Sequence, residues 1–324
     1  MVTPVAQILS LGAYVPDAVL TNAELEAMVD TSDTWIVERT GIRERRRVAP
    51  GETVATMGAR AAEEALARAG NLRPDAIIVA TCSADTPLPS AACLIQERLG
   101  IGGMPAFDIN AACSGFVYAL ALSDSLIRSR AVSTVLVVAS EALTTMTDYT
   151  DRSTCVLFGD GAAAAVVGVG EGDGGIRAVR WAADGADADL IYFGTRADDD
   201  DGGRAIRMAG RGTFRSAVER LSEAALHLCA DAGWTAGDVD WFIPHQANLR
   251  IIEATAKRLG VSMDRVIVNV DRVGNTSAAS IPLAIHEAAA AGRVRPGQKI
   301  ISVAFGSGVT WGGVALEWTG NPSL

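Results

Sequence analysis

The sequence contains few of the residues that mark secreted, metal-binding or nucleic-acid-binding proteins. Only five of its 324 residues are cysteine, and no C-x-x-C pair occurs, so neither a disulfide framework nor a structural zinc site is indicated. The net charge of −10 disfavours a nucleic-acid partner. No apolar run is long enough to span a bilayer, and residues 1–16 lack the basic and apolar regions of a secretory signal. We therefore expect a protein of the reducing cytoplasm, without a metal and without membrane contact.

Aromatic residues are also scarce, at 5% of the chain, whereas 49% of the residues are hydrophobic and 33 are glycine. A hydrophobic fraction of this size is sufficient for a large buried core. Small side chains allow helices and strands to approach each other closely, which suits a compact, layered α/β protein.

Strand-length apolar runs alternate with helical patterns along the first half of the chain. The continuous β-branched runs are typical of strands buried on both faces, as in parallel sheets. We predict strands over Gln7–Ala13, Ala76–Thr81, Ala106–Ile109, Val135–Ser140 and Ala164–Val169, and helices over Thr53–Ala69, Ala91–Leu99 and Gly115–Ser129.

The same order of elements begins again after the glycine-rich stretch Gly168–Gly175. Here we predict strands over Ile176–Ala182, Trp241–Pro244, Val266–Val270, Lys299–Phe305 and Gly312–Trp318, and helices over Thr213–Ala232, Leu249–Leu259 and Ala278–Ala291. The repeated order predicts two similar βαβ layers packed together, with one half over residues 1–172 and the other over 173–324. The stretch Ala197–Gly203, with four consecutive aspartates, is predicted to be a surface loop.

Cys113 lies in the segment Asp108-Ile-Asn-Ala-Ala-Cys-Ser-Gly-Phe116, where a predicted strand leads into a helix. Small neighbours leave room for a substrate, and the helix N-terminus favours the thiolate form of a cysteine. An isolated free cysteine is more often a small buried hydrophobic residue. We assign that structural role to the remaining four cysteines, Cys82, Cys93, Cys155 and Cys229.

His245 and Asn275 occupy corresponding corners of the second half. His245 ends a predicted strand in Trp241-Phe-Ile-Pro-His-Gln-Ala-Asn248, and the ends of strands are where α/β folds place ligands. Asn275, in Val273-Gly-Asn-Thr-Ser-Ala-Ala-Ser280, would by itself indicate only a turn or a helix cap. In a doubled fold these two corners and that of Cys113 can converge on one site. The other histidines, His227 and His286, lie inside predicted helices.

These segments resemble the β-ketoacyl-acyl carrier protein synthase III family, and the resemblance extends from about Leu9 to Trp318. Further matching segments are Asp30-Thr-Ser-Asp-Thr-Trp-Ile, Arg39-Thr-Gly-Ile-Arg, Phe158-Gly-Asp-Gly and Phe305-Gly-Ser-Gly-Val-Thr-Trp. The resemblance implies a thiolase-like α/β fold, in which duplicated βαβαβαββ halves pack as a five-layered α-β-α-β-α sandwich.

The resemblance also implies the reaction. The family joins an acyl-CoA primer to malonyl-acyl carrier protein with loss of carbon dioxide, and so initiates type II fatty acid synthesis without a cofactor. By resemblance, Cys113 is the nucleophile, and His245 and Asn275 donate hydrogen bonds to the malonyl thioester oxygen. The backbone N–H groups of Cys113 and Ser307 form the oxyanion hole, although the turn at Ser307 is often all glycine in the family.

Other positions match the family's binding residues. For the CoA substrate these are Trp35, Arg39, Thr40, Arg152, Phe158, Met208, Gly210, Phe214, Ala247, Asn248 and Phe305; for docking of the acidic acyl carrier protein they are Arg215, Arg250, Lys257 and Arg258. The family is homodimeric, and the segment Thr86–Pro89 closes the partner's acyl pocket with Leu88, where acetyl-specific enzymes often carry phenylalanine. We expect primers of about four carbons to be accepted beside acetyl-CoA.

Other functions share some of these features. A priming ketosynthase of a polyketide or other specialised pathway would carry the same motifs. A thioester or peptide hydrolase could also use Cys, His and Asn, but the Cys-Gly-Ser-Cys-Trp signature of papain-like enzymes is absent and the doubled order of elements is wrong for that fold. A non-enzymatic relative that kept the fold would usually have lost the nucleophile.

Overall fold

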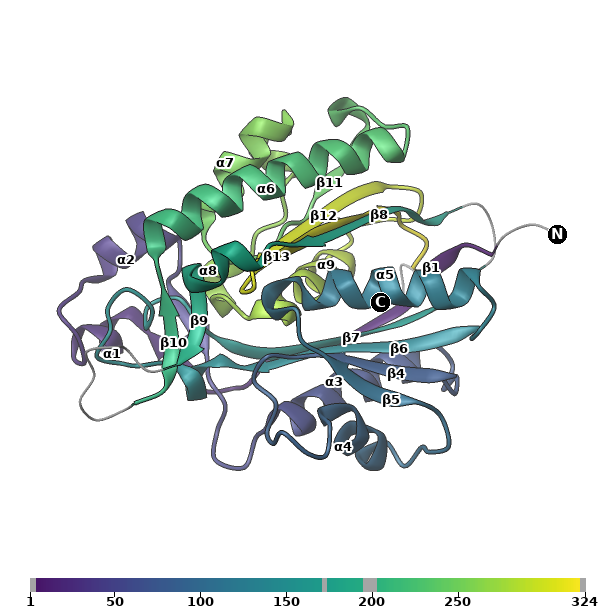
Figure 1. The fold of residues 1–324 in the computed structure, drawn as a ribbon, viewed down its shortest axis with the longest axis horizontal. Helices are drawn as coiled ribbons and strands as arrows, with labels where there is room; N and C mark the ends of the chain where they lie inside the picture. Colours follow the sequence, from purple (N-terminus) through teal and green to yellow (C-terminus); the bar gives the residue numbers. More distant parts are fainter. Residues whose placement is uncertain (1–3, 171–173, 195–202, 321–324) are drawn as a thin grey trace.

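Two mixed β-sheets alternate with three layers of helices in the computed structural model, which describes residues 4–170, 174–194 and 203–320. The layer helices are α3 (Val54–Arg68), α4 (Ala91–Arg98), α5 (Gly115–Arg128), α6 (Gly210–Asp231), α7 (Leu249–Leu259) and α9 (Ser280–Ala290). Helices α3 and α4 cover the outer face of one sheet, α5 and α9 lie between the sheets, and α6 and α7 cover the other outer face (Figure 1). The five-layered α-β-α-β-α arrangement is therefore confirmed.

The first sheet has the strand order β1-β7-β6-β4-β5. Its strands are β1 (Ala6–Tyr14), β4 (Ala76–Ala80), β5 (Ala106–Ile109), β6 (Thr134–Ala142) and β7 (Asp160–Val169). The three strands β5, β4 and β6 run parallel, and β7 is antiparallel to both β6 and β1. Every predicted strand of this half is present, and β4 is buried along its whole length, as its apolar run predicts.

The second sheet has the order β11-β12-β13-β8, which repeats the first sheet with one strand fewer. Its strands are β8 (Gly175–Ala183), β11 (Trp241–Phe242), β12 (Lys299–Gly306) and β13 (Thr310–Glu317). As in the first sheet, the first strand of the half pairs antiparallel with the last. The two halves thus repeat one topology, while the predicted boundary between residues 172 and 173 lies outside the described residues.

The prediction of a strand over Val266–Val270 is wrong. Val266 forms only an isolated bridge with Phe242, and the chain enters the short helix α8 (Val270–Val273). The side chain of Gln246 supplies the bonds that a neighbouring strand would provide: its amide donates to the Ile267 carbonyl at 3.1 Å and accepts from the Asn269 N–H at 3.0 Å. A side-chain amide therefore replaces part of the strand ladder.

Two insertions interrupt the repeat, and neither was indicated by hydrophobic periodicity. The first contains β2 (Val19–Thr21), α1 (Asn22–Glu26), α2 (Asp33–Thr40) and β3 (Glu44–Arg46), and the second contains β9 (Ile191–Gly194) and β10 (Ala205–Met208). The remaining short segments are the 3₁₀ turns η1 (Ala112–Ser114), η2 (Leu143–Met146), η3 (Gly185–Leu190), η4 (Ala236–Asp238), η5 (Met263–Arg265) and η6 (Ser277–Ala279). The predicted loop Ala197–Gly203 lies, up to residue 202, outside the described residues.

Small residues allow the layers to pack closely. A Cβ atom on Gly12 of β1 would lie 2.2 Å from the Ala61 carbonyl oxygen of α3, so only glycine permits this approach. Ser10 reinforces the same contact by donating a hydrogen bond to the Ala65 carbonyl at 2.7 Å. Three apolar cores result, one between the sheets and one under each outer helix layer.

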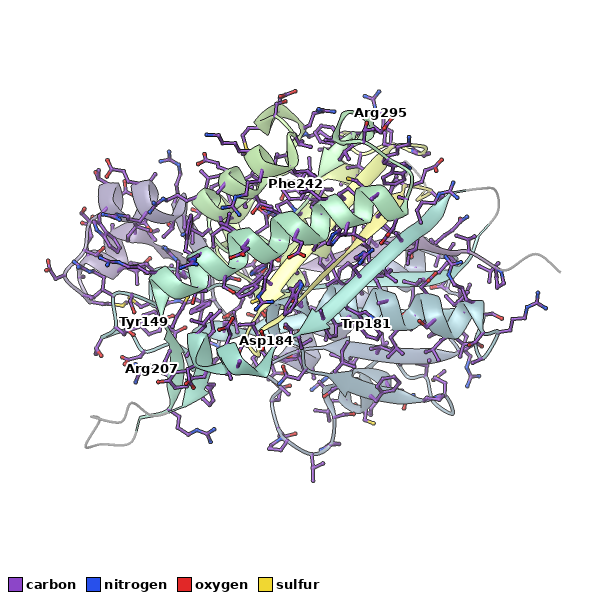
Figure 2. The ribbon with its side chains drawn as sticks, turned by 45° about the horizontal axis from the view of Figure 1, so that its top comes forward. Tyr149, Trp181, Asp184, Arg207, Phe242 and Arg295 are labelled. Carbon is purple, nitrogen blue, oxygen red and sulfur yellow. The ribbon has the colours of Figure 1, made fainter. Side chains whose placement is uncertain are left out.

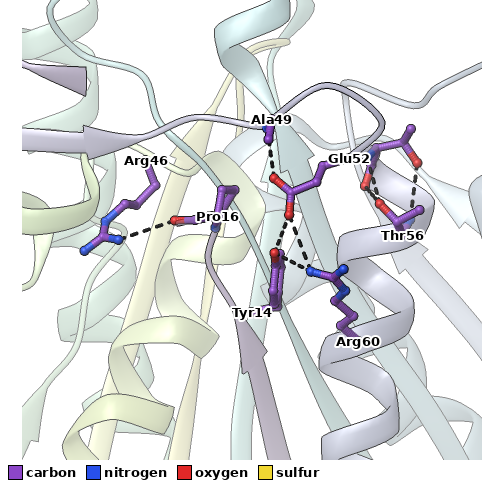
Figure 3. A network of polar contacts seen from close by, with 8 residues as sticks. Tyr14, Pro16, Arg46, Ala49, Glu52, Thr56 and Arg60 are labelled. Atoms are coloured by element: carbon purple, nitrogen blue, oxygen red, sulfur yellow. Dashed lines mark hydrogen bonds and ion pairs between the residues drawn. The ribbon is translucent and has the colours of Figure 1, made fainter. Parts of the chain in front are cut away.

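A polar network fixes the loop that leads from the first insertion into α3 (Figure 3). Glu52 accepts a hydrogen bond from the backbone N–H of Ala49 at 2.8 Å and a second from the hydroxyl of Tyr14 at the end of β1. The guanidinium group of Arg60 donates to the Tyr14 oxygen. These bonds attach the first insertion, which forms one wall of the cavity described below, to strand β1 of the first sheet.

Within the described ranges, none of the helices combines the length and the apolar character needed to cross a membrane.

Candidate active site

A cavity of about 1290 Å³ opens where strands β4, β5 and β12 end. It contains all three of the predicted corner residues, Cys113, His245 and Asn275. The carboxyl ends of strands are the usual location of ligand sites in α/β sheets. The duplicated fold therefore brings together side chains that are 162 residues apart in the sequence.

Cys113 lies in the η1 turn, directly before α5. Its neighbour Ala112 has a φ of 46°, a left-handed value that non-glycine residues seldom adopt outside functional turns. The β12–β13 turn packs on this corner so closely that a Cβ atom on Gly306 would lie 2.7 Å from the Cys113 backbone nitrogen. Ser307 follows in that turn and lines the cavity; its φ is not left-handed, so serine is tolerated there.

The thiol of Cys113 is not the resting thiolate that the helix N-terminus led us to expect. Burial raises the pKa of this thiol to about 12, and the negative charge of Glu141 acts in the same direction. Desolvation therefore outweighs the favourable helix terminus before a substrate arrives. The resting thiol is therefore protonated at neutral pH.

His245 follows β11 and is 3% exposed. Burial lowers the pKa of its imidazole to about 3, so the ring is neutral at physiological pH. Its Nδ1 lies 2.6 Å from the Ser280 hydroxyl oxygen, which also accepts a hydrogen bond from the Gln246 N–H at 3.3 Å. When the Ser280 hydroxyl is the donor to Nδ1, the imidazole proton lies on Nε2, where it can be donated to the cavity.

Asn275 is held by both its backbone and its side chain. The backbone N–H donates to the Leu157 carbonyl at 2.9 Å, and the carbonyl accepts from the Gly159 N–H at 3.0 Å. The side-chain oxygen accepts the Ser277 N–H at 2.9 Å. The amide NH₂ is therefore the end of the side chain that can donate to a ligand. His245 and Asn275 together present two neutral donors to one cavity.

A buried carboxylate beside these residues was not predicted from the sequence. Glu141, at the end of β6, is 0% exposed and accepts a hydrogen bond from the Ser277 hydroxyl at 3.0 Å. Ser277 lines the cavity and has a φ of 48°, in the turn that corresponds to η1 of the first half. A glutamate at the end of the apolar run of β6 was the signal that could have identified this group, because glutamate is almost never fully buried unless it is paired.

The outer part of the cavity is lined by residues of the insertions and of α6 and α7. Trp35 of α2 is half-buried, and the Arg152 guanidinium group lies over its ring at 4.9 Å from the centroid. Asn248 caps α7 by accepting the Arg250 N–H at 2.9 Å, and it donates to the Arg39 carbonyl at 3.0 Å. The other predicted CoA-binding residues in the lining are Thr40, Phe158, Met208, Gly210, Phe214, Ala247 and Phe305.

Strand β10 forms one wall of the cavity, and an ion pair holds it in place: the Arg207 guanidinium group lies 2.7 Å from the Asp148 carboxylate. Figure 2 shows Arg207 and Tyr149, the residue after Asp148, on the same side of the molecule, far from Arg295. Additional lining residues that the sequence did not indicate are Tyr192, Phe193, Ile206, Arg211 and Thr310. Tyr192, Phe193 and Ile206 lie on the four-residue strands β9 and β10, which carry too little periodicity to predict such a position.

Four of the predicted binding residues do not line this cavity. Lys257 and Arg258 are exposed in the last turn of α7, whereas Arg250, at its first turn, lines the cavity mouth and stacks over Phe214 at 5.6 Å. Arg215 of α6 faces a separate, polar hollow with acidic neighbours. Leu88 is 86% exposed, on the loop between β4 and α4.

Among the remaining cysteines, the predicted burial is wrong for Cys93 and only partly met by Cys82. Cys93 is exposed on α4, and Cys82, two residues beyond the end of β4, lines the cavity. Cys82 reaches that position because β4 ends at the same sheet edge as the strand before Cys113. Cys155 and Cys229 are buried, as predicted. His227 and His286 lie in α6 and α9, also as predicted.

Comparison with family models gives two matches. The model described as 3-oxoacyl-[acyl-carrier-protein] synthase III matches residues 107–185, and the model of its C-terminal part matches residues 229–318. The first match includes Cys113, and the second includes His245 and Asn275. The two matches therefore cover the corners of both halves.

Similarity to individual proteins extends over nearly the whole chain. The beta-ketoacyl-[acyl-carrier-protein] synthase III of Cereibacter sphaeroides is 49% identical over 321 residues, covering 97% of this chain and 99% of the relative. The Escherichia coli K12 protein of the same name is 49% identical over 316 residues, covering 96% of this chain and 99% of the relative.

Solved structures give the same result. The 3-oxoacyl-[acyl-carrier-protein] synthase III of Aquifex aeolicus has a TM-score of 0.91 at 46% identity, covering 97% of this chain and 100% of the other. The priming beta-ketosynthase of the R1128 polyketide biosynthetic pathway has a TM-score of 0.92 at 37% identity, covering 98% of this chain and 97% of the other.

Proposed function

The chain belongs to the β-ketoacyl-acyl carrier protein synthase III family, and from this premise we propose that Cys113, His245 and Asn275 divide its two half-reactions between them. As a member it is an acyltransferase: it condenses an acyl-CoA primer with malonyl-acyl carrier protein and initiates fatty acid synthesis. The products are 3-oxoacyl-acyl carrier protein, CoA and carbon dioxide. The observation that carries the residue assignment is the convergence of the Cys113 thiol, at the start of α5, with two neutral donors in a single cavity.

In the first half-reaction Cys113 attacks the thioester carbonyl of the primer and displaces CoA. Sulfur suits this role because it is a strong nucleophile and, later, a good leaving group. The oxyanion is stabilised by the backbone N–H groups of Cys113 and Ser307. The close packing of the Gly306 turn on the Cys113 corner supports this pairing.

In the second half-reaction malonyl-acyl carrier protein loses carbon dioxide, and negative charge develops on its thioester oxygen. The Nε2–H of His245 and the NH₂ group of Asn275 donate hydrogen bonds to this oxygen. A neutral imidazole is required for such a donor, and the burial of His245 keeps it neutral. Loss of one preorganised donor of this kind typically costs about 10²–10³ in rate. The carbanion then attacks the acyl group on Cys113.

The outer cavity holds the CoA substrate. The adenine ring stacks on Trp35, and Arg39 and Arg152 contact the phosphorylated end. The pantetheine arm passes Phe214, Ala247 and Asn248 toward Cys113, because these residues and the thiol line one continuous cavity. The exposed basic residues Arg250, Lys257 and Arg258 on α7 attract the acidic carrier protein to its mouth, whereas Arg215 on α6 faces the separate hollow with acidic neighbours.

The active enzyme is a homodimer in this proposal. Strand β5 forms one edge of its sheet, and its Phe107 is 37% exposed. An exposed edge strand with an aromatic side chain favours pairing with a second copy. Leu88, exposed in the single chain, would then close the acyl pocket of the partner. A cytoplasmic location fits, since a reducing compartment keeps the Cys113 thiol free.

The experiment that tests this function is incubation of the enzyme with acetyl-CoA and malonyl-acyl carrier protein, followed by mass spectrometry of the carrier protein. We expect acetoacetyl-acyl carrier protein and free CoA. Free acetate without a carrier-bound product would instead identify a thioester hydrolase. A strong preference for a long or unusual primer across a panel of acyl-CoA thioesters would favour a priming ketosynthase, the activity that is named for one structural neighbour.

A further inference from the structure

A buried arginine lies between the first insertion and the Asn275 corner, and the mechanism above does not use it. Arg45, at the centre of β3, is 0% exposed. Its Nη1 donates to the Leu20 carbonyl at 3.1 Å and to the Asn22 side-chain oxygen at 2.8 Å, and its Nη2 donates to the Val156 carbonyl at 2.9 Å. All three acceptors are uncharged, and among the described residues no carboxylate forms an ion pair with this guanidinium group.

The position of Arg45 is costly, because taking an unpaired charge out of water is strongly unfavourable. Burial lowers the pKa of the Arg45 guanidinium group to about 10, which still leaves the group charged near neutral pH. Its Nε has no hydrogen-bond partner in the described part of the chain, so the two terminal nitrogens make its contacts. Such a fork suits a residue that must hold separate segments of the chain in one fixed arrangement.

On one side, Arg45 holds the first insertion together. Asn22, which accepts a hydrogen bond from Arg45, donates through its own Nδ2 to Asp33 Oδ1 at 2.8 Å and to the Ile42 carbonyl at 2.9 Å. Asp33 begins α2, and Ile42 lies just beyond its end. One side-chain amide therefore connects both ends of α2, the helix that carries Trp35 in the cavity wall, to the Arg45 guanidinium group.

On the other side, Arg45 holds the segment that fixes Asn275. The carbonyl that accepts its Nη2 belongs to the residue before Leu157. The Leu157 carbonyl accepts the Asn275 N–H at 2.9 Å, and the Gly159 N–H donates to the Asn275 carbonyl at 3.0 Å. The stem of Arg45 packs on the same corner, since a Cβ atom on Gly274 would lie 2.9 Å from the Arg45 Cβ. Arg45 therefore contacts both the residue before Asn275 and the segment to which Asn275 is bonded.

We propose that Arg45 is a positioning residue for Asn275: its guanidinium fork ties the first insertion to the segment that holds Asn275, and so fixes the amide that donates to the malonyl thioester oxygen. This inference rests on the proposed role of Asn275 in decarboxylation. Arg45 is not among the residues that line the cavity, so it acts on the reaction through its neighbours. Accurate placement of a donor matters because a displacement of about 1 Å can cost about 10²-fold in rate.

A purely structural role for Arg45 must be distinguished, because its side chain joins three segments. Arg45→Met keeps an unbranched stem and removes all of the hydrogen bonds. Arg45→Lys keeps the charge, but a single ammonium group cannot reproduce a fork that bonds segments on two sides. The matched control is Arg46→Met, in the next residue of β3. The half-buried Arg46 contacts the Pro16 carbonyl and Glu44, and neither residue lines the cavity (Figure 3).

The measurement follows the two half-reactions of the enzyme separately. Acylation of Cys113 by saturating acetyl-CoA is followed by rapid quench and intact mass, and decarboxylation by the acylated enzyme is followed as carbon dioxide released from saturating malonyl-acyl carrier protein. We expect Arg45→Met and Arg45→Lys to slow decarboxylation about 10²-fold, the usual effect of losing one preorganised donor. Their acylation rates should stay within about threefold of wild type, because Asn275 serves only the second half-reaction. Arg46→Met should stay within about threefold of wild type in both half-reactions.

A double variant tests whether the effect of Arg45 passes through Asn275. Asn275→Ala already removes the donor that Arg45 positions. Adding Arg45→Met to Asn275→Ala should therefore slow decarboxylation by no more than about threefold further, because residues that act as a unit are not additive. Two residues that act independently would multiply their losses, to about 10⁴-fold or more. Arg45→Lys replaces Arg45→Met in this comparison if the methionine variant does not fold.

The possible outcomes separate this inference from the proposed function. Multiplied losses in the double variant, or decarboxylation by Arg45→Lys at the rate of Arg46→Met, would overturn the positioning role alone. Equal slowing of acylation and decarboxylation by the Arg45 variants would also overturn it, by showing that Arg45 only stabilises the fold. Decarboxylation by Asn275→Ala at the wild-type rate would overturn the proposed role of Asn275, and this inference with it.

Discussion

Burial acts in opposite directions on the protonation of Cys113 and His245. It raises the pKa of the thiol to about 12 and lowers the pKa of the imidazole to about 3. Both residues are therefore uncharged in the resting site. Before a substrate binds, the thiol is protonated. The neutral imidazole can donate a hydrogen bond without adding charge to the site.

The raised pKa of Cys113 predicts how its alkylation depends on pH. The thiolate is the nucleophile, so the rate of reaction with iodoacetamide should rise about tenfold per pH unit from pH 7 to pH 9. A Cys93→Ser background removes the exposed thiol from the mass measurement. A rate that levels off below pH 8 would show that the resting cysteine is a thiolate.

The lowered pKa of His245 predicts an imidazole that does not titrate. Its Cε1–H resonance, assigned with single substitutions of the three histidines, should not shift between pH 8 and pH 5. An unfolded histidine binds a proton near pH 6.5, and His245 in the fold does not, so this residue lowers stability as pH falls from about 6.5 toward 3. A sigmoidal shift with a midpoint above pH 5 would contradict the neutral donor.

The corner residues could be predicted from the sequence, but their supporting partners could not. Cys113 and His245 each follow a predicted strand that is present, and only the strand predicted before Asn275 is replaced by the short helix α8. Glu141 and Ser277 are 136 residues apart, and only the packing of the two halves brings them together. A hydrogen-bond partner of this kind leaves no periodic signal in the sequence.

At the scale of elements, α7 combines a buried and a charged face. Ile251, Ile252 and Leu259 pack inward, and the helix ends at Gly260 with a φ of 81°. Its basic residues remain exposed, and those in the last turn also interact favourably with the helix dipole. The hydrophobic periodicity was sufficient to predict Leu249–Leu259 as observed, since the cap residues at both ends are also typical.

The exposed face of α7 predicts an effect on carrier-protein binding. Arg250→Glu should raise the KM for malonyl-acyl carrier protein on the order of tenfold at low salt, and less at high salt, because steering charges are screened. The rate of acylation from acetyl-CoA should change much less. Arg295→Glu, a charge reversal at an exposed residue that does not line the cavity, is the matched control. Equal effects of Arg250→Glu on both half-reactions would give Arg250 a role in CoA binding instead.

The prediction of strands from the sequence failed in two situations: where a side chain replaced backbone pairing, and where a strand was very short. The residues Val266–Val270 have the composition of a strand, but the amide of Gln246 occupies the hydrogen bonds of Ile267 and Asn269. The short strands β2, β3, β9 and β10 of the insertions contain three or four residues each, too few for an alternating pattern to appear. Long buried strands such as β6 and β7 were predictable because they are apolar on both faces.

At the scale of the whole molecule, the duplicated topology positions the site, and a second copy of the chain completes it in our proposal. The cavity of one chain contains the proposed reacting groups, whereas Leu88 is not among its lining residues and is 86% exposed. The repeated order of strands and helices was enough to predict the layers. The dimer contact depends on surface residues that carry no such pattern.

Leu88 is expected to set the range of primers. Leucine is smaller than phenylalanine, and each additional buried methylene of a primer contributes about 0.8 kcal/mol. We expect butyryl-CoA and isobutyryl-CoA to be used beside acetyl-CoA, and Leu88→Phe to reduce kcat/KM for the four-carbon primers several-fold. Size-exclusion chromatography must show that the variant remains dimeric. An unchanged primer profile in a dimeric variant would remove Leu88 as the selector.

The most direct test of the account is the intact mass of three proteins after exposure to acetyl-CoA. We predict that the wild type and His245→Ala each gain one acetyl group on Cys113, because His245 serves only the decarboxylation step, while Cys113→Ala gains none. His245→Ala, once acylated, should then fail to decarboxylate malonyl-acyl carrier protein at more than about 10⁻² of the wild-type rate. Acetylation of Cys113→Ala, or full condensation by His245→Ala, would contradict the division of the reaction between these residues.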